Sequence, residues 1–165
     1  MRVLIPIEVE PYVEAQFDFV RSFKWPDNTE VKILHVLHSV QIEGTMVSSL
    51  GYLEQIMKDA RKLSKKMSSE LAEKIKKACP DIEVLETIEE GDAIKVILEN
   101  AKEWQADMIV MGSQGRQGIG SFVLGSVAYS VLANAPCKTI ILGVPRESHM
   151  NGDYTGEKKV ELKIK

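Results

Sequence analysis

The sequence predicts a doubly wound α/β fold with a five-stranded parallel sheet, strand order 3-2-1-4-5, and helices on both faces. Two observations predict it. Short apolar runs rich in β-branched residues alternate along the chain with longer stretches of helical period. Near-continuous apolar runs, such as residues 108–111, are typical of parallel strands buried on both faces. The repetition of strand, helix and strand implies right-handed crossovers and a covered sheet, which is a Rossmann-like architecture.

The predicted strands are the apolar runs themselves. The near-continuous run Met108-Ile109-Val110-Met111 gives the strongest signal of a buried strand. The five runs are residues 3–7, 31–37, 82–88, 108–111 and 139–142.

Four helices are predicted between the strands from apolar residues at helical spacing. They cover residues 11–23, 53–78 and 93–104, and a fourth begins between 121 and 126 and ends at 133. Pro11 suits the first position of its helix, and Asp92 is placed to cap the third. Pro80 stops the second helix. Asn134, two residues before Pro136, is predicted to end the fourth in a left-handed conformation.

The composition indicates one domain and excludes several classes of protein. The chain has 165 residues, of which 44% are hydrophobic, and a chain of that length buries a core without disulfides. Its 24 acidic and 21 basic residues give a net charge of −3, which favours neither nucleic acid nor an anionic membrane as a partner. No apolar stretch approaches the length of a membrane span. Cys79 and Cys137 form no metal-binding pattern, so we expect a reducing, cytoplasmic compartment.

A glycine-rich segment at residues 112–126 carries the strongest functional signal. It holds five of the chain's eleven glycines, follows the apolar strand at 108–111 and precedes a helix. Glycines let a backbone turn sharply and bring N–H groups close to a ligand, and a helix start adds unpaired donors and a positive dipole end. The combination suits a phosphate group.

Two common phosphate motifs do not fit this segment. The P-loop pattern fails because Gly125 is followed by Ser126 and no lysine, and the dinucleotide pattern G-x-G-x-x-G fails at Val123. Arg116 is the only cation in the segment, so backbone amides have to supply most of the anion binding.

The predicted strand order brings the glycine-rich segment opposite the end of the first strand, across the switch point where doubly wound sheets bind ligands. Glu8 and Glu10 follow that first strand. From there they could reach a ribose hydroxyl or a metal ion.

The spaced residues Gly112-x2-Gly115-x9-Gly125-Ser126 resemble the G-x2-G-x9-G-[ST] signature of the ATP-binding class of universal stress proteins. The resemblance covers about residues 1–144. Four further stretches carry it, at residues 34–36, 91–92, 106–112 and 135–137. It implies a stress-response or regulatory protein that binds ATP, or ADP or AMP, with Mg²⁺ held through the nucleotide phosphates and not directly by the protein.

The same resemblance implies which residues meet the nucleotide. The phosphates would meet the glycine-rich segment at Gly112, Gln114, Gly115, Gly125, Ser126 and Val127, and Arg116, as the only cation of the segment, is assigned to the same site. The adenine and ribose would meet the ends of the first, second and fourth strands at Pro6, Ile7, Glu8, Val36 and Met111.

Glu8 departs from the family pattern, in which an Asp ends the first strand. Glu is one methylene longer, so it either keeps the ribose contact from a shifted position or crowds the pocket. Three hypotheses stay open: a nucleotide-binding regulatory protein, an enzyme with slow ATP hydrolysis or other phosphate chemistry that uses Glu8 or Glu10, and an interaction module that has lost nucleotide binding. No side chain is placed as a general base, so no catalytic residue is assigned.

The resemblance ends near Pro145, which divides the chain into a nucleotide-binding domain at residues 1–145 and a C-terminal extension at 146–165. Residues 159–165 alternate strictly between charged and apolar, which is the period of a strand. We expect a sixth strand, antiparallel to the fifth or to a partner subunit, with a disordered tail as the alternative. The family resemblance implies a homodimer formed through the fifth strand, and the protein partners are unknown.

Other features are assigned structural roles. His35 is expected in the core. The second helix carries a net charge of +4 (eight basic and four acidic residues), which predicts a solvated face more readily than a docking surface. The acidic stretch at residues 81–92 is expected to offset it. A serine hydrolase elbow, G-x-S-x-G, is absent, and a phospho-receiver site is disfavoured because Glu89 and Glu90 stand where an acceptor Asp is needed.

Overall fold

The fold is that of a computed structural model, which describes residues 1–8, 11–38, 50–113, 124–143 and 162–164. Its sheet has the order β3-β2-β1-β4-β5-β6, so the predicted order of the first five strands is confirmed. β1 to β5 are parallel, and β6 is antiparallel to β5. The strands are β1 (Arg2–Ile7), β2 (Glu30–Leu37), β3 (Glu83–Glu90), β4 (Met108–Gly112), β5 (Lys138–Leu142) and β6 (Leu162–Ile164).

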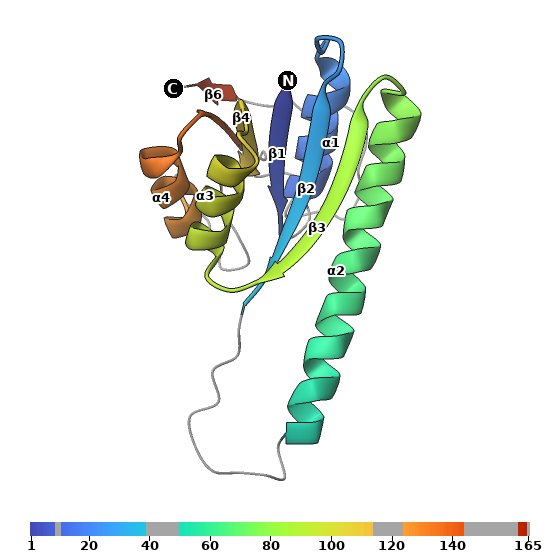
Figure 1. Cartoon of the computed structure of the whole chain (residues 1–165), viewed down its shortest axis with the longest axis vertical. Helices are drawn as coiled ribbons and strands as arrows, with labels where there is room; N and C mark the ends of the chain where they lie inside the picture. Colours follow the sequence, from blue (N-terminus) through green and yellow to red (C-terminus); the bar gives the residue numbers. More distant parts are fainter. Residues whose placement is uncertain (9–10, 39–49, 114–123, 144–161, 165) are drawn as a thin grey trace.

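Two pairs of helices cover the two faces of the sheet (Figure 1). α1 and α2 pack on one face and α3 and α4 on the other, as the two separate core clusters require. Alternate residues of each strand enter different clusters: Ile5 lies with α1 and α2, whereas Leu4 lies with α3 and α4. The helices are α1 (Tyr12–Ser22), α2 (Leu50–Ala78), α3 (Ala93–Glu103) and α4 (Ser126–Asn134).

The predicted helix ends have two different outcomes. The carboxylate of Asp92 accepts a hydrogen bond from the Lys95 amide at 2.9 Å, so the predicted cap of α3 is confirmed. The predicted left-handed stop at Asn134 is wrong, because Asn134 is the last helical residue and Ala135 follows with an extended backbone (φ −61°, ψ 136°). Pro136 disfavours helical geometry at Ala135, and this steric effect ends α4 without a left-handed residue.

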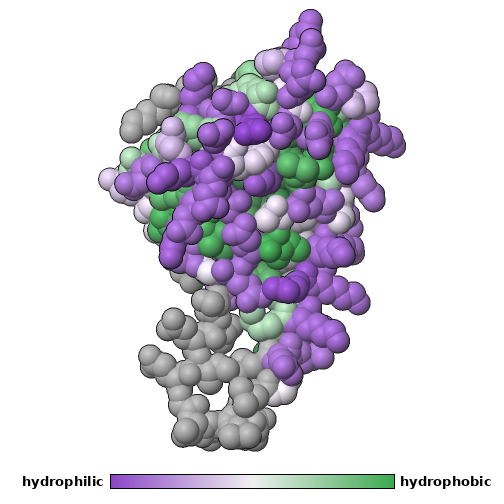
Figure 2. Space-filling model, in the orientation of Figure 1, coloured by the Kyte–Doolittle hydropathy of each residue, from purple (hydrophilic) through white to green (hydrophobic). Residues whose placement is uncertain are grey.

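α2 is longer than the sheet and begins at Leu50, three residues before the predicted start. In Figure 1 its first half extends past the carboxyl ends of the strands. Its outward face is largely hydrophilic (Figure 2), and its eight basic residues are all exposed, as expected for a solvated face. Arg61 pairs with Glu90 of β3, which confirms that the acidic stretch offsets part of the helix charge. Lys74 pairs with Glu14 of α1 at 2.7 Å and ties the two helices together.

β6 occupies the outer edge of β5. The register pairs Ile164 with Ile140, Lys163 with Ile141 and Leu162 with Leu142. The expected sixth strand is therefore present at the centre of the alternating segment, antiparallel to the fifth strand of the same chain. β6, and not β5, is therefore the outermost strand on this side of the sheet.

No helix in the described ranges combines the length and the apolar character that a bilayer crossing requires.

Candidate functional site

The predicted site lies where β1 and β4 end side by side. We call this place the β1–β4 edge and define it as residues 6–8 and 111–113. β1 pairs with β4 at Val3 with Met108 and Leu4 with Ile109, toward the start of both strands. Strand order reverses between these two strands, so their carboxyl ends flank the switch point where doubly wound folds bind ligands.

A buried glutamine of α1 connects the two strands near this edge. The Gln16 side chain is 1% exposed, and its Nε2 donates to the carbonyl oxygens of Pro6 (2.7 Å) and Val110 (3.1 Å). One side-chain amide therefore satisfies a main-chain acceptor on each strand. Gln16 thus fixes the spacing of β1 and β4 beside the site, a role that the sequence analysis missed. Its signal was a polar residue on the apolar stripe of α1, between Val13 and Val20.

Tyr12, the first residue of α1, lies against the end of β4. A Cβ atom placed on Gly112 would fall 2.6 Å from Cγ, 2.7 Å from Cδ1 and 2.9 Å from Cβ of Tyr12. Only glycine fits at position 112, because these atoms form the rigid base of a side chain that is 9% exposed. The predicted importance of Gly112 therefore has a packing cause in addition to any contact with a ligand.

Ser113 joins three parts of the site. Its N–H donates to the Leu142 carbonyl of β5 at 2.8 Å, and its carbonyl accepts from the Gly125 N–H at 2.8 Å. Its hydroxyl lies 3.5 Å from the Tyr12 hydroxyl. The two ends of the glycine-rich segment are thus held together at the end of β4.

The start of α4 is available for an anion. Gly125 is its N-cap, and no side chain caps it within the described part of the chain. Ser126 and Val127 are its first two residues, and the main-chain N–H groups of a first turn have no partner within their helix. The Gly125 N–H, by contrast, already donates to Ser113. A phosphate at this point would meet N–H donors that have no partner within the helix, and the positive end of the helix dipole.

The structure divides the remaining predicted residues between the two faces of the sheet. Ile7 lies in the core on the α1 side, whereas Met111 and Val36 belong to the core on the α3 and α4 side. Pro6 is buried in β1, and Glu8 is half-buried just after it. Gln114, Gly115 and Arg116 of the glycine-rich segment, and Glu10, lie outside the described residues.

Two other expectations concern chemistry away from this edge. His35 is buried in β2 at 2% exposure, as expected of a core residue. Cys79 and Cys137 are free thiols, each half-buried. Across the described ranges, no group of three His, Cys, Asp or Glu side chains is arranged to hold a metal ion.

Comparison with known proteins gives a consistent family assignment. Residues 1–143 match the model of the universal stress protein family. The chain is 30% identical to the universal stress protein YxiE of Bacillus subtilis over 144 residues, which cover 86% of this chain and 97% of that protein.

Solved structures share the fold. That of hypothetical protein MJ0577 has a TM-score of 0.67 at 22% identity and covers 88% of this chain and 96% of that one. A universal stress protein family member of Arabidopsis thaliana with AMP bound has a TM-score of 0.56 at 15% identity, covering 89% and 94%. A universal stress protein in complex with cAMP has a TM-score of 0.60 at 17% identity, covering 87% and 96%.

Proposed function

Because the chain belongs to the universal stress protein family, we propose that it binds an adenine nucleotide at the β1–β4 edge and serves as a nucleotide-dependent regulatory protein of the stress response. The observation that carries the proposal is the uncapped start of α4, held beside β4 by the Ser113 carbonyl. The relatives with bound AMP and cAMP support an adenine nucleotide as the ligand class. ATP is the proposed physiological ligand, with ADP and AMP as its competitors.

The phosphates are assigned to the segment between β4 and α4. Ser126 and Val127 offer main-chain N–H groups of the first turn of α4, and the Ser126 hydroxyl is an added donor. The Gly125 N–H is already bonded to Ser113 and is therefore not counted as a phosphate donor. Gly125 contributes instead by letting the backbone come close to the phosphate, because glycine has no side chain. Gly112, Gln114, Gly115 and Arg116 complete the proposed phosphate set, with Mg²⁺ bound to the phosphates themselves.

The base and sugar are assigned to the strand ends. Main-chain groups around Pro6, Ile7 and Val36 would meet the adenine, and Met111 would line its pocket. Glu8 would accept a hydrogen bond from a ribose hydroxyl. Its position directly after β1 and its partial burial support that role.

A homodimer is the proposed assembly, formed at the side of the sheet where β5 and β6 lie. β6 covers the outer side of β5, so β6 would belong to the interface that the family forms through its fifth strand. The two free thiols support a reducing compartment such as the cytoplasm.

The test is calorimetric titration of the full chain with Mg-ATP, ADP and AMP, beside analysis of any nucleotide that purifies with it. Ser126→Asp sharpens the test, because a carboxylate at a helix start stabilises the helix by about 0.3–1 kcal/mol but repels a phosphate. We expect this variant to melt at the same or a higher temperature and to lose nucleotide binding. Ala133→Asp, in the last turn of the same helix, adds the same charge away from the site and should keep the affinity. Absence of heat at millimolar nucleotide in the unaltered protein would reject the proposal.

A further inference from the structure

The side chain of Tyr12, which packs against the β1–β4 edge at Gly112, is left unexplained by the proposed function. A tyrosine ring at the start of α1 is buried to 9% exposure against the end of β4. Its base is fixed by contact with the main chain of Gly112, where even a methyl group would not fit. The ring therefore packs directly on the main chain of β4, and this contact places the hydroxyl at its far end near Ser113.

That hydroxyl lies next to a second one. The Tyr12 and Ser113 hydroxyl oxygens are 3.5 Å apart, at the outer limit of a hydrogen bond. Each hydroxyl has one proton to donate and two lone pairs. Even if the pair shares one proton, the other remains for a third group.

The two hydroxyls lie at the point where the glycine-rich segment begins and ends. Ser113 is held by its main chain to Leu142 of β5 and to Gly125, the residue before α4. The start of α1 is at the same place, and no side chain of the described residues caps it. Two helix starts that no described side chain caps thus lie, with two hydroxyls, at the end of β4, which is an arrangement suited to an anion.

We propose that the Tyr12 hydroxyl donates a hydrogen bond to a phosphate oxygen of the bound nucleotide and makes the site selective for nucleotides over nucleosides. The proposal rests on the proposed function and adds a residue from α1, outside the glycine-rich segment. Ser113 acts as the positioning residue that holds the hydroxyl of Tyr12 beside α4. A hydrogen bond from a hydroxyl to a charged phosphate is stronger than one to a neutral acceptor.

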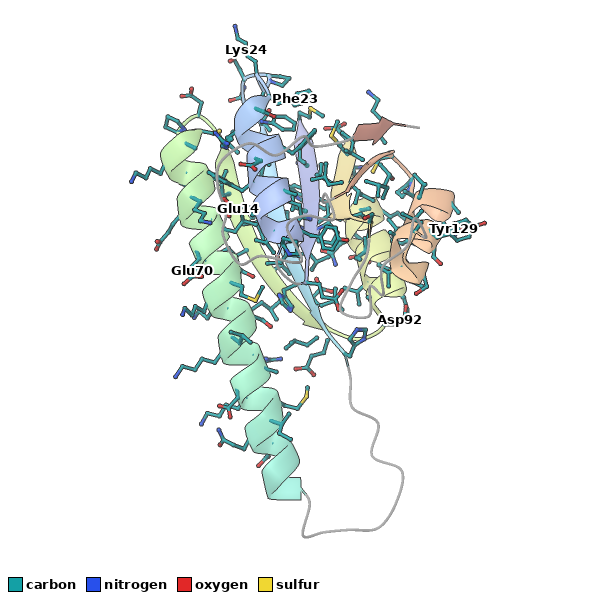
Figure 3. All side chains as sticks on the ribbon, turned by 180° about the vertical axis from the view of Figure 1, so that it is seen from behind. Glu14, Phe23, Lys24, Glu70, Asp92 and Tyr129 are labelled. Carbon is teal, nitrogen blue, oxygen red and sulfur yellow. The ribbon has the colours of Figure 1, made fainter. Side chains whose placement is uncertain are left out.

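The test compares Tyr12→Phe with the unaltered protein by calorimetric titration with Mg-ATP, AMP and adenosine. Phenylalanine keeps the ring against Gly112 and removes only the hydroxyl, so the melting temperature without ligand should stay the same. We expect about ten-fold weaker binding of ATP and AMP and unchanged binding of adenosine. Tyr129→Phe is the matched control, because Tyr129 is 64% exposed on α4 and points away from the body of the protein (Figure 3).

The outcomes separate this inference from the proposed function. If the unaltered protein binds nucleotide and Tyr12→Phe binds it equally well, the role of Tyr12 is wrong and the nucleotide site stands. If Tyr12→Phe weakens adenosine as much as ATP, the residue shapes the pocket without contacting phosphate, and the inference is again overturned. If the unaltered protein binds no nucleotide, both proposals fail.

Discussion

The side-chain nitrogen of Gln16 lies 2.7 Å from the carbonyl oxygen of Pro6 and donates a hydrogen bond to it. The same nitrogen reaches the Val110 carbonyl of β4 at 3.1 Å. A residue of α1 therefore holds the two strands whose ends form the candidate site.

Replacement of Gln16 is expected to cost stability. Gln16→Met keeps the volume but leaves two carbonyls without this donor, so the free energy of unfolding should fall by about 2 kcal/mol. Gln16→Glu should lose more at neutral pH, because a carboxylate cannot donate, and should recover part of the loss in acid, where the protonated group donates once. Urea unfolding at pH 7 and pH 5 measures both. Gln55→Met on the exposed side of α2 is the control and should change stability by less than about 0.5 kcal/mol.

Gly112→Ala should destabilise the fold through Tyr12. The new methyl group would fall 2.6 Å from the ring, so the end of β4 or the start of α1 has to move, at a cost of about 1–3 kcal/mol. Gly51→Ala is the contrasting substitution, because nothing lies within 4 Å of its added methyl group and alanine favours the helix. A double-mutant cycle with Tyr12→Ala checks the cause: if the two losses simply add, the clash with Tyr12 is not the reason.

Substitutions of Glu8 distinguish the hypothesis of a nucleotide-binding protein from that of an enzyme. If it contacts the ribose, Glu8→Ala should weaken Mg-ATP binding by about ten-fold, since a hydrogen bond to a charged group is worth about 1.5–3 kcal/mol. Titration and ADP release measured on the same preparation distinguish the two functions. Turnover that disappears in Glu8→Gln while affinity is retained would favour phosphate chemistry, with Glu8 as base or metal ligand.

Removal of residues 146–165 should uncover the outer edge of β5, which β6 now pairs. We expect a lower melting temperature and a changed balance of monomer and dimer, measured by light scattering after size-exclusion chromatography. Ile164→Pro tests the same strand with a single substitution, because proline has no N–H to donate between β6 and β5. Lys165→Pro, just beyond β6, is its control. An unchanged dimer with unchanged melting would show that β6 contributes to neither.

The two thiols should react slowly near neutral pH. Burial, and then the charge of Asp81, raise the pKa of the Cys79 thiol, and burial followed by Asp107 raises the pKa of Cys137. Alkylation rates of the single variants Cys79→Ala and Cys137→Ala should therefore rise with midpoints above the ordinary thiol value of 9.0. The unfolded chain loses these protons at lower pH than the folded one, so the thiols reduce stability as the pH rises through that interval. A midpoint at or below pH 8 would contradict this account.

The fold was predictable because its signals are local and repeated. The apolar run at residues 108–111 and the helical spacing in α2 both reflect burial, which composition and periodicity report directly. The error at Asn134 arose where two end signals compete, since proline two residues later stops α4 by steric exclusion alone.

The site was predictable only in outline. The glycine spacing located the segment, but the contacts of Tyr12, Gln16 and Ser113 join residues about a hundred positions apart or cross between elements. No periodicity encodes such contacts. The local sequence signal for these contacts is Gln16, a polar residue among the buried positions of α1.

The bond between the Ser113 carbonyl and the Gly125 N–H has a consequence for how this protein can evolve. It fixes both ends of the segment that joins β4 to α4, independently of what lies between them. Extra residues in a loop with fixed ends cost only a logarithmic increase in closure entropy, about 0.6 kcal/mol for each doubling of length. Descendants of this chain can therefore lengthen, shorten or rewrite that segment, and so change the ligand, while the scaffold beneath it keeps its stability.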